Sequence, residues 1–206
     1  MTKNYREPNT EFQFEGFHHL ALVAKDMEET VDFYSNKLGM PLFKAIDLPH
    51  GIGQHFFFDV GNGDSLAFFW FPDAPPASPG VASQGSNQMS GIGSMNHVAF
   101  QVSEDKIEEY VQRLRSKGIE CSDVTNHDMS VNQIAPHITD GTWARSVYFK
   151  DPNGIGLELC YWPKEFSKED RELKAANGSD IESYLELKRN SAEAVASLLD
   201  DPSTRD

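Results

Sequence analysis

The chain contains two copies of one sequence pattern, and this repeat restricts the possible fold more than any other feature. Residues 19–40 and residues 97–119 each begin with a histidine and continue with a short apolar stretch and an acidic residue. Each then shows a helical pattern of apolar residues that ends near a glycine. Because a repeated pattern reports a repeated structural unit, we expect two modules of the same topology.

The first copy predicts a strand, a helix and then three strands. Asp26 is suited to begin the helix as its N-cap, with Glu29 three residues later, and Gly39 is suited to end it. The glycine-rich turn at 61–64 (GNGD) predicts a hairpin between the last two strands. The predicted strands cover residues 17–24, 42–47, 54–60 and 64–71.

The second copy predicts the same order of elements. Apolar residues at helical spacing predict a helix over about residues 104–116, which Gly118 ends. The segment 151–154 (DPNG) predicts a tight turn before the last strand. The predicted strands cover residues 95–102, 119–125, 145–150 and 155–161. The fold class is therefore α+β, with two tandem β-α-β-β-β modules.

Composition divides the chain into five segments. Residues 72–94 are rich in Pro, Gly and Ser, as expected for a linker, and the residues after Pro163 are charged, with an amphipathic helical pattern. We expect an N-terminal extension (1–15), a first module (16–71), a linker (72–94), a second module (95–162) and a charged helical C-terminal tail (163–206).

The formal net charge is −14 at pH 7, from 32 acidic residues against 18 Lys and Arg. This charge argues against a nucleic-acid partner, because phosphate binding requires a basic surface. No apolar run approaches the roughly 18 residues of a membrane span, so we expect no membrane partner. Two cysteines, Cys121 and Cys160, are too few for a disulfide framework, and we expect a cytoplasmic protein.

Three side chains of metal-binding type lie on strand faces that do not suit the core. Because side chains alternate between the two faces of a strand, His19, His97 and Glu158 each point away from the more apolar face. Equivalent positions in two repeats become neighbours if the modules pack symmetrically. Two histidines and one carboxylate with three open positions form the facial triad of non-haem Fe(II) sites. His18, which points to the opposite face from His19, is the alternative ligand.

The repeats resemble the vicinal oxygen chelate superfamily, which includes glyoxalase I, extradiol dioxygenases, methylmalonyl-CoA epimerase and bleomycin- or fosfomycin-resistance proteins. The resemblance rests on an acidic residue seven positions after each histidine, Asp26 and Glu104, and on FKDPNGIGLEL at residues 149–159. It covers about residues 16–162. It implies a cupped mixed sheet around one divalent metal, with the ligands His19, His97 and Glu158.

The resemblance also suggests a reaction. Glyoxalase I uses a further carboxylate from the last strand of the first module, where this sequence has Ala67, so its three-ligand set is more similar to that of extradiol dioxygenases. Those enzymes place a tyrosine ten residues before the glutamate ligand, which is Tyr148 here. They also carry a histidine in the preceding loop, for which His137 and then His127 are the candidates.

A further histidine that these dioxygenases usually carry shortly before the second metal ligand is missing here. Either His50 or His55 takes its place, or the chemistry differs. Pocket walls suited to a planar ring are predicted from Phe58, Phe69 and Trp143.

We therefore expect a metal-dependent extradiol ring-cleaving dioxygenase that acts on a catechol-type aromatic diol with O₂. It would use Fe(II), with Mn(II) or another divalent metal as the alternative. A second hypothesis is a glyoxalase- or epimerase-type lyase or isomerase with a divalent metal as Lewis acid. A third is a metal-free binding or resistance protein of the same fold. The N-terminal residues and the C-terminal helix are candidate contacts of a homodimer, in which the modules pair within one chain or between two.

Overall fold

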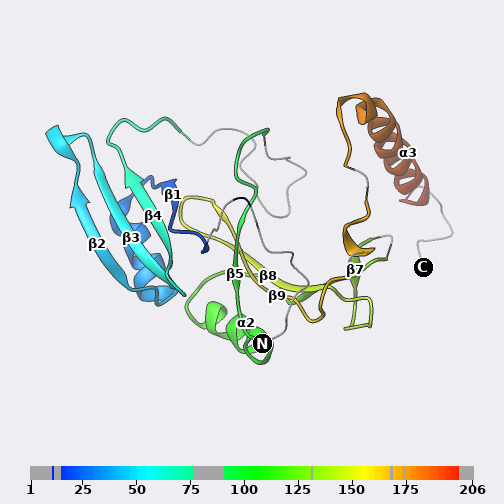
Figure 1. Ribbon diagram of the computed structural model, residues 1–206, viewed down its shortest axis with the longest axis horizontal. Helices are drawn as coiled ribbons and strands as arrows, with labels where there is room; N and C mark the ends of the chain where they lie inside the picture. Colours follow the sequence, from blue (N-terminus) through cyan, green and yellow to red (C-terminus); the bar gives the residue numbers. More distant parts are fainter. Residues whose placement is uncertain are drawn as a thin grey trace. The chain divides into compact units, whose positions relative to one another are not determined.

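The computed structural model describes residues 11, 15–76, 91–130, 132–167, 169–173 and 175–199 of the 206-residue chain (Figure 1). Most of the predicted N-terminal extension and of the predicted linker 72–94 lies outside these residues. The contacts group the chain into two compact units, Met1–Glu165 and Phe166–Asp206.

The first module is a four-stranded sheet. Its strand β1 is parallel to β4, because a helix connects β1 to the rest of the sheet, and the other neighbouring strands are antiparallel. A 3-10 turn, η2 (Pro49–Gly51), separates β2 from β3. The strands, in the spatial order β1-β4-β3-β2, are β1 (Leu20–Val23), β2 (Leu42–Asp47), β3 (Gln54–Gly61) and β4 (Asp64–Trp70).

A helix follows β1, as the sequence predicts. It begins as α1 (Met27–Val31), and the Asp26 side chain accepts a hydrogen bond from the Glu29 backbone N–H at 2.9 Å, which confirms the predicted N-cap. It continues as the π-helix η1 (Asp32–Lys37). Gly39 follows with a φ of 79°, a conformation that glycine adopts without strain.

The second module repeats this plan with a five-stranded sheet, in which β5 is parallel to β9. The 3-10 turn η3 (Glu104–Lys106) and the helix α2 (Ile107–Ser116) follow β5, and α2 buries one apolar face. The strands, in the spatial order β5-β9-β8-β6-β7, are β5 (Val98–Gln101), β6 (Thr125–His127), β7 (Ile134–Ala135), β8 (Ala144–Lys150) and β9 (Gly156–Tyr161).

The predicted strand 119–125 forms only in part. Cys121 makes an isolated bridge to β8, and β6 begins at Thr125. Between them, the Tyr148 backbone N–H donates to the Ser122 hydroxyl at 3.0 Å. A side-chain oxygen thus takes the place of a strand carbonyl, which interrupts the ladder.

The α+β class is confirmed, and the first module has the predicted β-α-β-β-β order. The second module has the same order with one additional short strand, β7. The strands nevertheless form two sheets instead of the one cupped sheet that the sequence analysis expects. Both β1 and β5 lie at the edge of their sheet, so one side of each strand has no strand neighbour within the described residues. Apolar side chains are exposed on β1, with Leu20 at 37% and Val23 at 51% exposure.

The turn between β8 and β9 joins the second module to the helical segment of the first. Asp151 in this turn accepts hydrogen bonds from the Ile155 backbone N–H at 2.7 Å and from the Tyr34 hydroxyl at 3.2 Å. The Asn153 side chain accepts another from the Lys25 backbone N–H at 2.9 Å. Burial raises the pKa of Asp151, and burial next to Asp151 raises the pKa of Tyr34, so the tyrosine keeps its proton and donates.

One hydrophobic core serves both modules. Fully buried residues from the first module, Tyr34, Phe58 and Phe68, belong to the same cluster as Ile107 and Leu157 from the second. The modules therefore share buried apolar surface in addition to the hydrogen bonds at the turn.

The C-terminal unit is helical. It contains the short 3-10 turns η4 (Glu169–Arg171) and η5 (Gly178–Asp180) and the helix α3 (Ile181–Leu199), which matches the predicted amphipathic helix. Among the described helices, none has the length and apolar character needed to cross a membrane.

Candidate functional site

His97 and Glu158 are in contact on one face of the second sheet. Ala99 pairs with Glu158 in the register of β5 and β9, and His97, two residues before Ala99, has the same parity. The His97 Nε2 and Glu158 Oε2 atoms are 2.8 Å apart. Glu158 is only 6% exposed, so this contact supplies the polar partner that a buried carboxylate requires.

The other ring nitrogen of His97 has its own partner. Its Nδ1 atom lies 2.6 Å from the side-chain oxygen Oδ1 of Asn96. Because an amide oxygen only accepts, the imidazole donates from Nδ1 in this bond, and Nε2 faces Glu158. The contact between Nε2 and Glu158 Oε2 requires a proton between these two atoms, and a metal ion bound there would take the place of that proton while Asn96 holds Nδ1.

Tyr148 and His127 lie next to this pair. Tyr148 is directly opposite Glu158 in the register of β8 and β9, and its hydroxyl oxygen lies 2.8 Å from His127 Nε2. Burial and the negative charge of Glu158 raise the pKa of Tyr148 to about 12. The phenol is therefore neutral at pH 7 and can donate a hydrogen bond to an oxygen atom in the pocket.

A pocket of about 400 Å³ opens beside these residues. Two indoles form part of its wall, Trp143 directly before β8 and Trp162 directly after β9, with ring centres 5.9 Å apart and planes inclined by 23°. Burial raises the pKa of the Cys160 thiol in this wall to about 11, so the thiol is neutral at pH 7. The remaining wall residues are Ala99, Phe100, Gln101 and Ala144.

The third predicted ligand, His19, lies beside the first sheet. Its Nδ1 atom is 2.8 Å from Nδ1 of His18, and its ring centre is 5.8 Å from that of Phe57. In the part of the chain that the structure describes, no three His, Cys, Asp or Glu side chains gather closely enough to hold a metal ion. A single copy of the chain thus brings two of the three predicted ligands together, and neither His18 nor His19 completes the set.

The register of the first sheet identifies the position equivalent to Glu158. Ala67 on β4 pairs with Ala21 on β1, just as Glu158 on β9 pairs with Ala99 on β5. Ala67 is fully buried. The first module thus has a methyl group where the second has a carboxylate, the correspondence that the sequence predicts.

Trp143 lines this pocket as predicted. The other predicted wall residues, Phe58 and Phe69, and the candidate histidines of the loops and of the first module do not line it. Phe58 is fully buried in the core, because its parity on β3 faces the helix, so it is a core residue rather than a pocket wall. Phe69 stacks on His55 within the first sheet, with ring centres 3.6 Å apart. His137 and His50 are exposed.

Three further residues line the pocket and were not among the predicted site residues: Trp162, Cys160 and Gln101. Trp162 and Cys160 share the parity of Glu158, and Gln101 shares that of His97. Strand alternation thus places Gln101 and Cys160 on the face of the two predicted ligands, and alternation carried one residue past the end of β9 adds Trp162.

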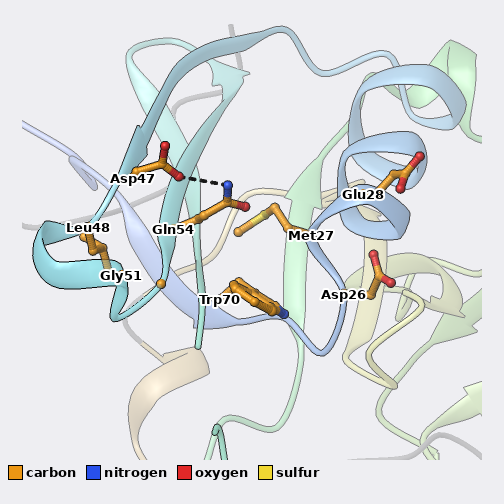
Figure 2. Close-up of a pocket in the computed structure, with 9 residues that line it drawn as sticks. Asp26, Met27, Glu28, Asp47, Leu48, Gly51, Gln54 and Trp70 are labelled. Carbon is orange, nitrogen blue, oxygen red and sulfur yellow. Dashed lines mark hydrogen bonds between the residues drawn. The ribbon is translucent and has the colours of Figure 1, made fainter. Parts of the chain in front are cut away.

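A second cavity, of about 510 Å³, lies in the first module (Figure 2). Asp26 and Glu28 from the start of the helix and Asp47 from β2 line it, together with Trp70. Asp47 accepts a hydrogen bond from the Gln54 amide at 3.0 Å, and Asp26 caps the helix. Two of the three carboxylates thus stabilise local structure, so we place the candidate site in the second module.

Comparisons with known proteins agree with the fold of the two modules. Residues 16–159 match the family model described as the Glyoxalase/Bleomycin resistance protein/Dioxygenase superfamily. MhqE of Bacillus subtilis (strain 168), whose name describes a candidate ring-cleaving dioxygenase, is 30% identical over 116 residues, which are 54% of this chain and 34% of MhqE. The chain thus spans about a third of that relative. The mitochondrial methylmalonyl-CoA epimerase of Homo sapiens is 27% identical over 149 residues, 69% of this chain and 71% of the epimerase.

Solved structures show the same fold. The glyoxalase family protein from Enterococcus faecalis has a TM-score of 0.52 and 25% identity, over 72% of this chain and 98% of that chain. A glyoxalase/dioxygenase from Nostoc punctiforme has a TM-score of 0.50 at 22% identity, over 73% of this chain and 92% of that chain, a likeness of fold alone. The family match includes both repeats, the turn at Asp151 and the His97–Glu158 pair. The chain therefore belongs to the glyoxalase/bleomycin resistance protein/dioxygenase superfamily.

Proposed function

We propose that the protein is a metal-dependent extradiol dioxygenase that opens the ring of a catechol-type aromatic diol with O₂. The observation that carries this proposal is the contact of His97 with Glu158 at 2.8 Å, with the Tyr148 phenol beside it in an aromatic pocket. A small ligand set leaves coordination positions open, and a reaction that brings a diol and dioxygen to one metal requires such positions. The similarity to MhqE supports the same reaction class.

His97 and Glu158 fit two positions of a divalent metal ion, and His19 is the candidate for the third. Because His19 lies beside the other sheet, we propose that His19 of a second copy completes the site in a homodimer. The edge positions of β1 and β5, and the exposed apolar side chains of β1, support contact between copies in this region. Two histidines and one carboxylate suit Fe(II), and Mn(II) fits the same donors.

A metal ion held by His97, Glu158 and His19 of the second copy would supply Lewis-acid chemistry for the diol and redox chemistry for dioxygen. Tyr148, which is neutral at pH 7, donates its hydroxyl hydrogen to a diol oxygen and thereby orients the ring. Once the phenol has turned to the substrate, His127 Nε2 is released to accept the proton that the diol loses. In the overall reaction one ring carbon–carbon bond breaks, and both atoms of one O₂ enter the product.

The test is to load the protein with Fe(II) under anaerobic conditions, measure iron per chain, and follow O₂ consumption with catechol and substituted catechols. We expect one iron per chain, one O₂ consumed per diol, and a coloured ring-opened product. His97→Ala should lose both iron and O₂ consumption, whereas His137→Ala, which changes an exposed histidine, should keep both. Bound iron without O₂ consumption on any diol would contradict the dioxygenase proposal.

Mixing two inactive variants tests the shared site. In a His19→Ala copy paired with a His97→Ala copy, one of the two sites keeps an intact His19, His97 and Glu158. Unfolding and refolding the two variants together should therefore restore O₂ consumption, while each variant alone stays inactive. No recovery in a mixture that does form dimers would exclude a site shared between copies.

A second candidate function is an epimerase-type isomerase, which the similarity to the human epimerase over 69% of the chain favours. A metal-polarised carbonyl would then release a neighbouring proton to a base, without oxygen. Mn(II)-loaded protein that exchanges such a proton with D₂O, and consumes no O₂ with any diol when loaded with Fe(II), would favour the isomerase. A metal-free binding protein would keep its ligand affinity in His97→Ala.

We also propose that the protein works in the cytoplasm. Cys121 and Cys160 are free thiols, as expected where the compartment keeps cysteines reduced. A reducing compartment would also keep the proposed iron in its Fe(II) state.

A further inference from the structure

Trp143 and Trp162 extend the pocket along the second sheet. Glu158 and Trp162 are four residues apart with the same parity, so at about 3.3 Å per residue their Cα atoms are separated by about 13 Å. Trp143 lies directly before β8, and its ring centre is 5.9 Å from that of Trp162. The indole pair therefore forms the end of the pocket that is remote from the carboxylate.

A series of flat side chains joins the two ends. The His127 ring centre lies 6.0 Å from that of Tyr148, which is paired with Glu158, and 5.6 Å from that of Trp143. The Trp143 indole N–H donates to the Asp128 carbonyl oxygen at 3.2 Å, which fixes the orientation of this ring. Fixed π surfaces favour a flat aromatic ligand over a flexible chain of the same size.

We propose that the substrate diol carries a second aromatic ring, which Trp143 and Trp162 bind while the diol oxygens lie at His97 and Glu158. This rests on the proposed function, which supplies the position of the diol. A single benzene ring at Glu158 is much shorter than the separation of about 13 Å along the strand, so it leaves the indoles in contact with water. A second ring attached beside the diol reaches the indoles and removes their apolar surface from water. Trp162 is thus a specificity-determining residue.

Anaerobic titration calorimetry on the full Fe(II)-loaded chain tests this with catechol, 3-phenylcatechol and 3-cyclohexylcatechol. We expect 3-phenylcatechol to bind at least about tenfold more tightly than catechol, and several-fold more tightly than the non-aromatic cyclohexyl compound. Trp162→Ala should lose about tenfold in affinity for 3-phenylcatechol and stay within about twofold for catechol, while Trp162→Phe keeps most of the preference. Trp70→Phe, which changes the indole of the other cavity, is the matched control and should change neither affinity.

Equal affinities for catechol and 3-phenylcatechol would overturn the inference, and so would a Trp162→Ala variant that weakens both to the same degree. If Trp162→Ala does not fold, as judged by circular dichroism, Trp162→Leu keeps apolar volume without a ring and allows the same comparison. Preferential binding of 3-phenylcatechol without O₂ consumption would contradict the dioxygenase and leave the aromatic subsite intact. O₂ consumption without a preference for the second ring would contradict the subsite alone.

Discussion

Asp151→Ala removes the acceptor on which the turn between β8 and β9 depends. The carboxylate accepts hydrogen bonds from the Ile155 and Asn153 backbone N–H groups at 2.7 and 2.9 Å, from the Asn153 side-chain amide at 2.8 Å, and from the Tyr34 hydroxyl at 3.2 Å. Ile155 and Tyr34 are buried, and each buried donor without an acceptor costs about 1–3 kcal/mol. We therefore expect the free energy of unfolding to fall by about 4 kcal/mol, a large part of the roughly 5–15 kcal/mol of a typical domain.

Urea unfolding at pH 7, followed by tryptophan fluorescence, measures this loss as a lower urea concentration at the unfolding midpoint, with the slope m of the transition unchanged. The matched control is Asp140→Ala, which removes an exposed aspartate and should change the stability by less than about 0.5 kcal/mol. A loss below about 1 kcal/mol in Asp151→Ala would refute the argument that the buried donors need this carboxylate.

Asp151→Asn removes the titrating group and keeps only one of its two acceptor oxygens, so this variant serves as a reference for the pH dependence alone. Burial raises the pKa of Asp151 above its unfolded value of about 3.9, so the folded protein holds this proton more tightly than the unfolded chain does. The carboxyl group thus contributes its full stability below the unfolded pKa, and the contribution is lost as the pH rises through the folded pKa. Relative to the non-titrating Asn variant, the wild type should lose stability as the pH rises across this range. A relative gain instead would mean that hydrogen bonds, rather than burial, dominate the pKa.

Glu158→Gln should weaken Fe(II) binding by more than about 100-fold, measured by competition with a chelator, because it removes a charged ligand and keeps its volume; unchanged binding would exclude Glu158 as a ligand. Tyr148→Phe should lower kcat for the preferred diol by about 10²–10⁴-fold in steady-state O₂ uptake, with a smaller change in diol affinity. Ser122→Ala leaves the Tyr148 backbone N–H without its acceptor and should cost about 1–2 kcal/mol in urea unfolding. Leu114→Ala, in the buried face of α2, should cost about 2–5 kcal/mol in the same assay.

The elements that the sequence predicts well are those whose structure depends on residues a few positions away along the chain. The predicted strand 42–47 coincides with β2, and Asp26 caps its helix as expected. The prediction for residues 119–125 was wrong over most of its length, because the Ser122 hydroxyl competes with the strand ladder, and alternation of apolar residues carries no information on such a bond. The separation into two sheets depends on packing between modules, which periodicity does not encode.

The same distinction holds for the candidate site: contacts within one module could be predicted from the sequence, and contacts between modules could not. His97 and Glu158 come from one module, so parity and the expected pairing of its strands were enough to place them together. His19 comes from the other module, and its distance from the pair depends on how modules or copies assemble. The sequence analysis placed His137 before His127, but His127 lines the pocket because β6 pairs with β8 and brings His127 opposite Ala144.

One substitution at Ala67 separates the proposed three-ligand site from a site with a second carboxylate. An alanine codon becomes a glutamate codon by one base change when the third base is a purine, and this change would give both repeats an acidic group at the same register position. Because Ala67 is fully buried, such a mutation would be tolerated only where a bound cation neutralises the new carboxylate. A metal ligand can thus be added or removed while every strand pair of the sheet stays in place. Relatives with different chemistry can therefore diverge while their backbones stay alike.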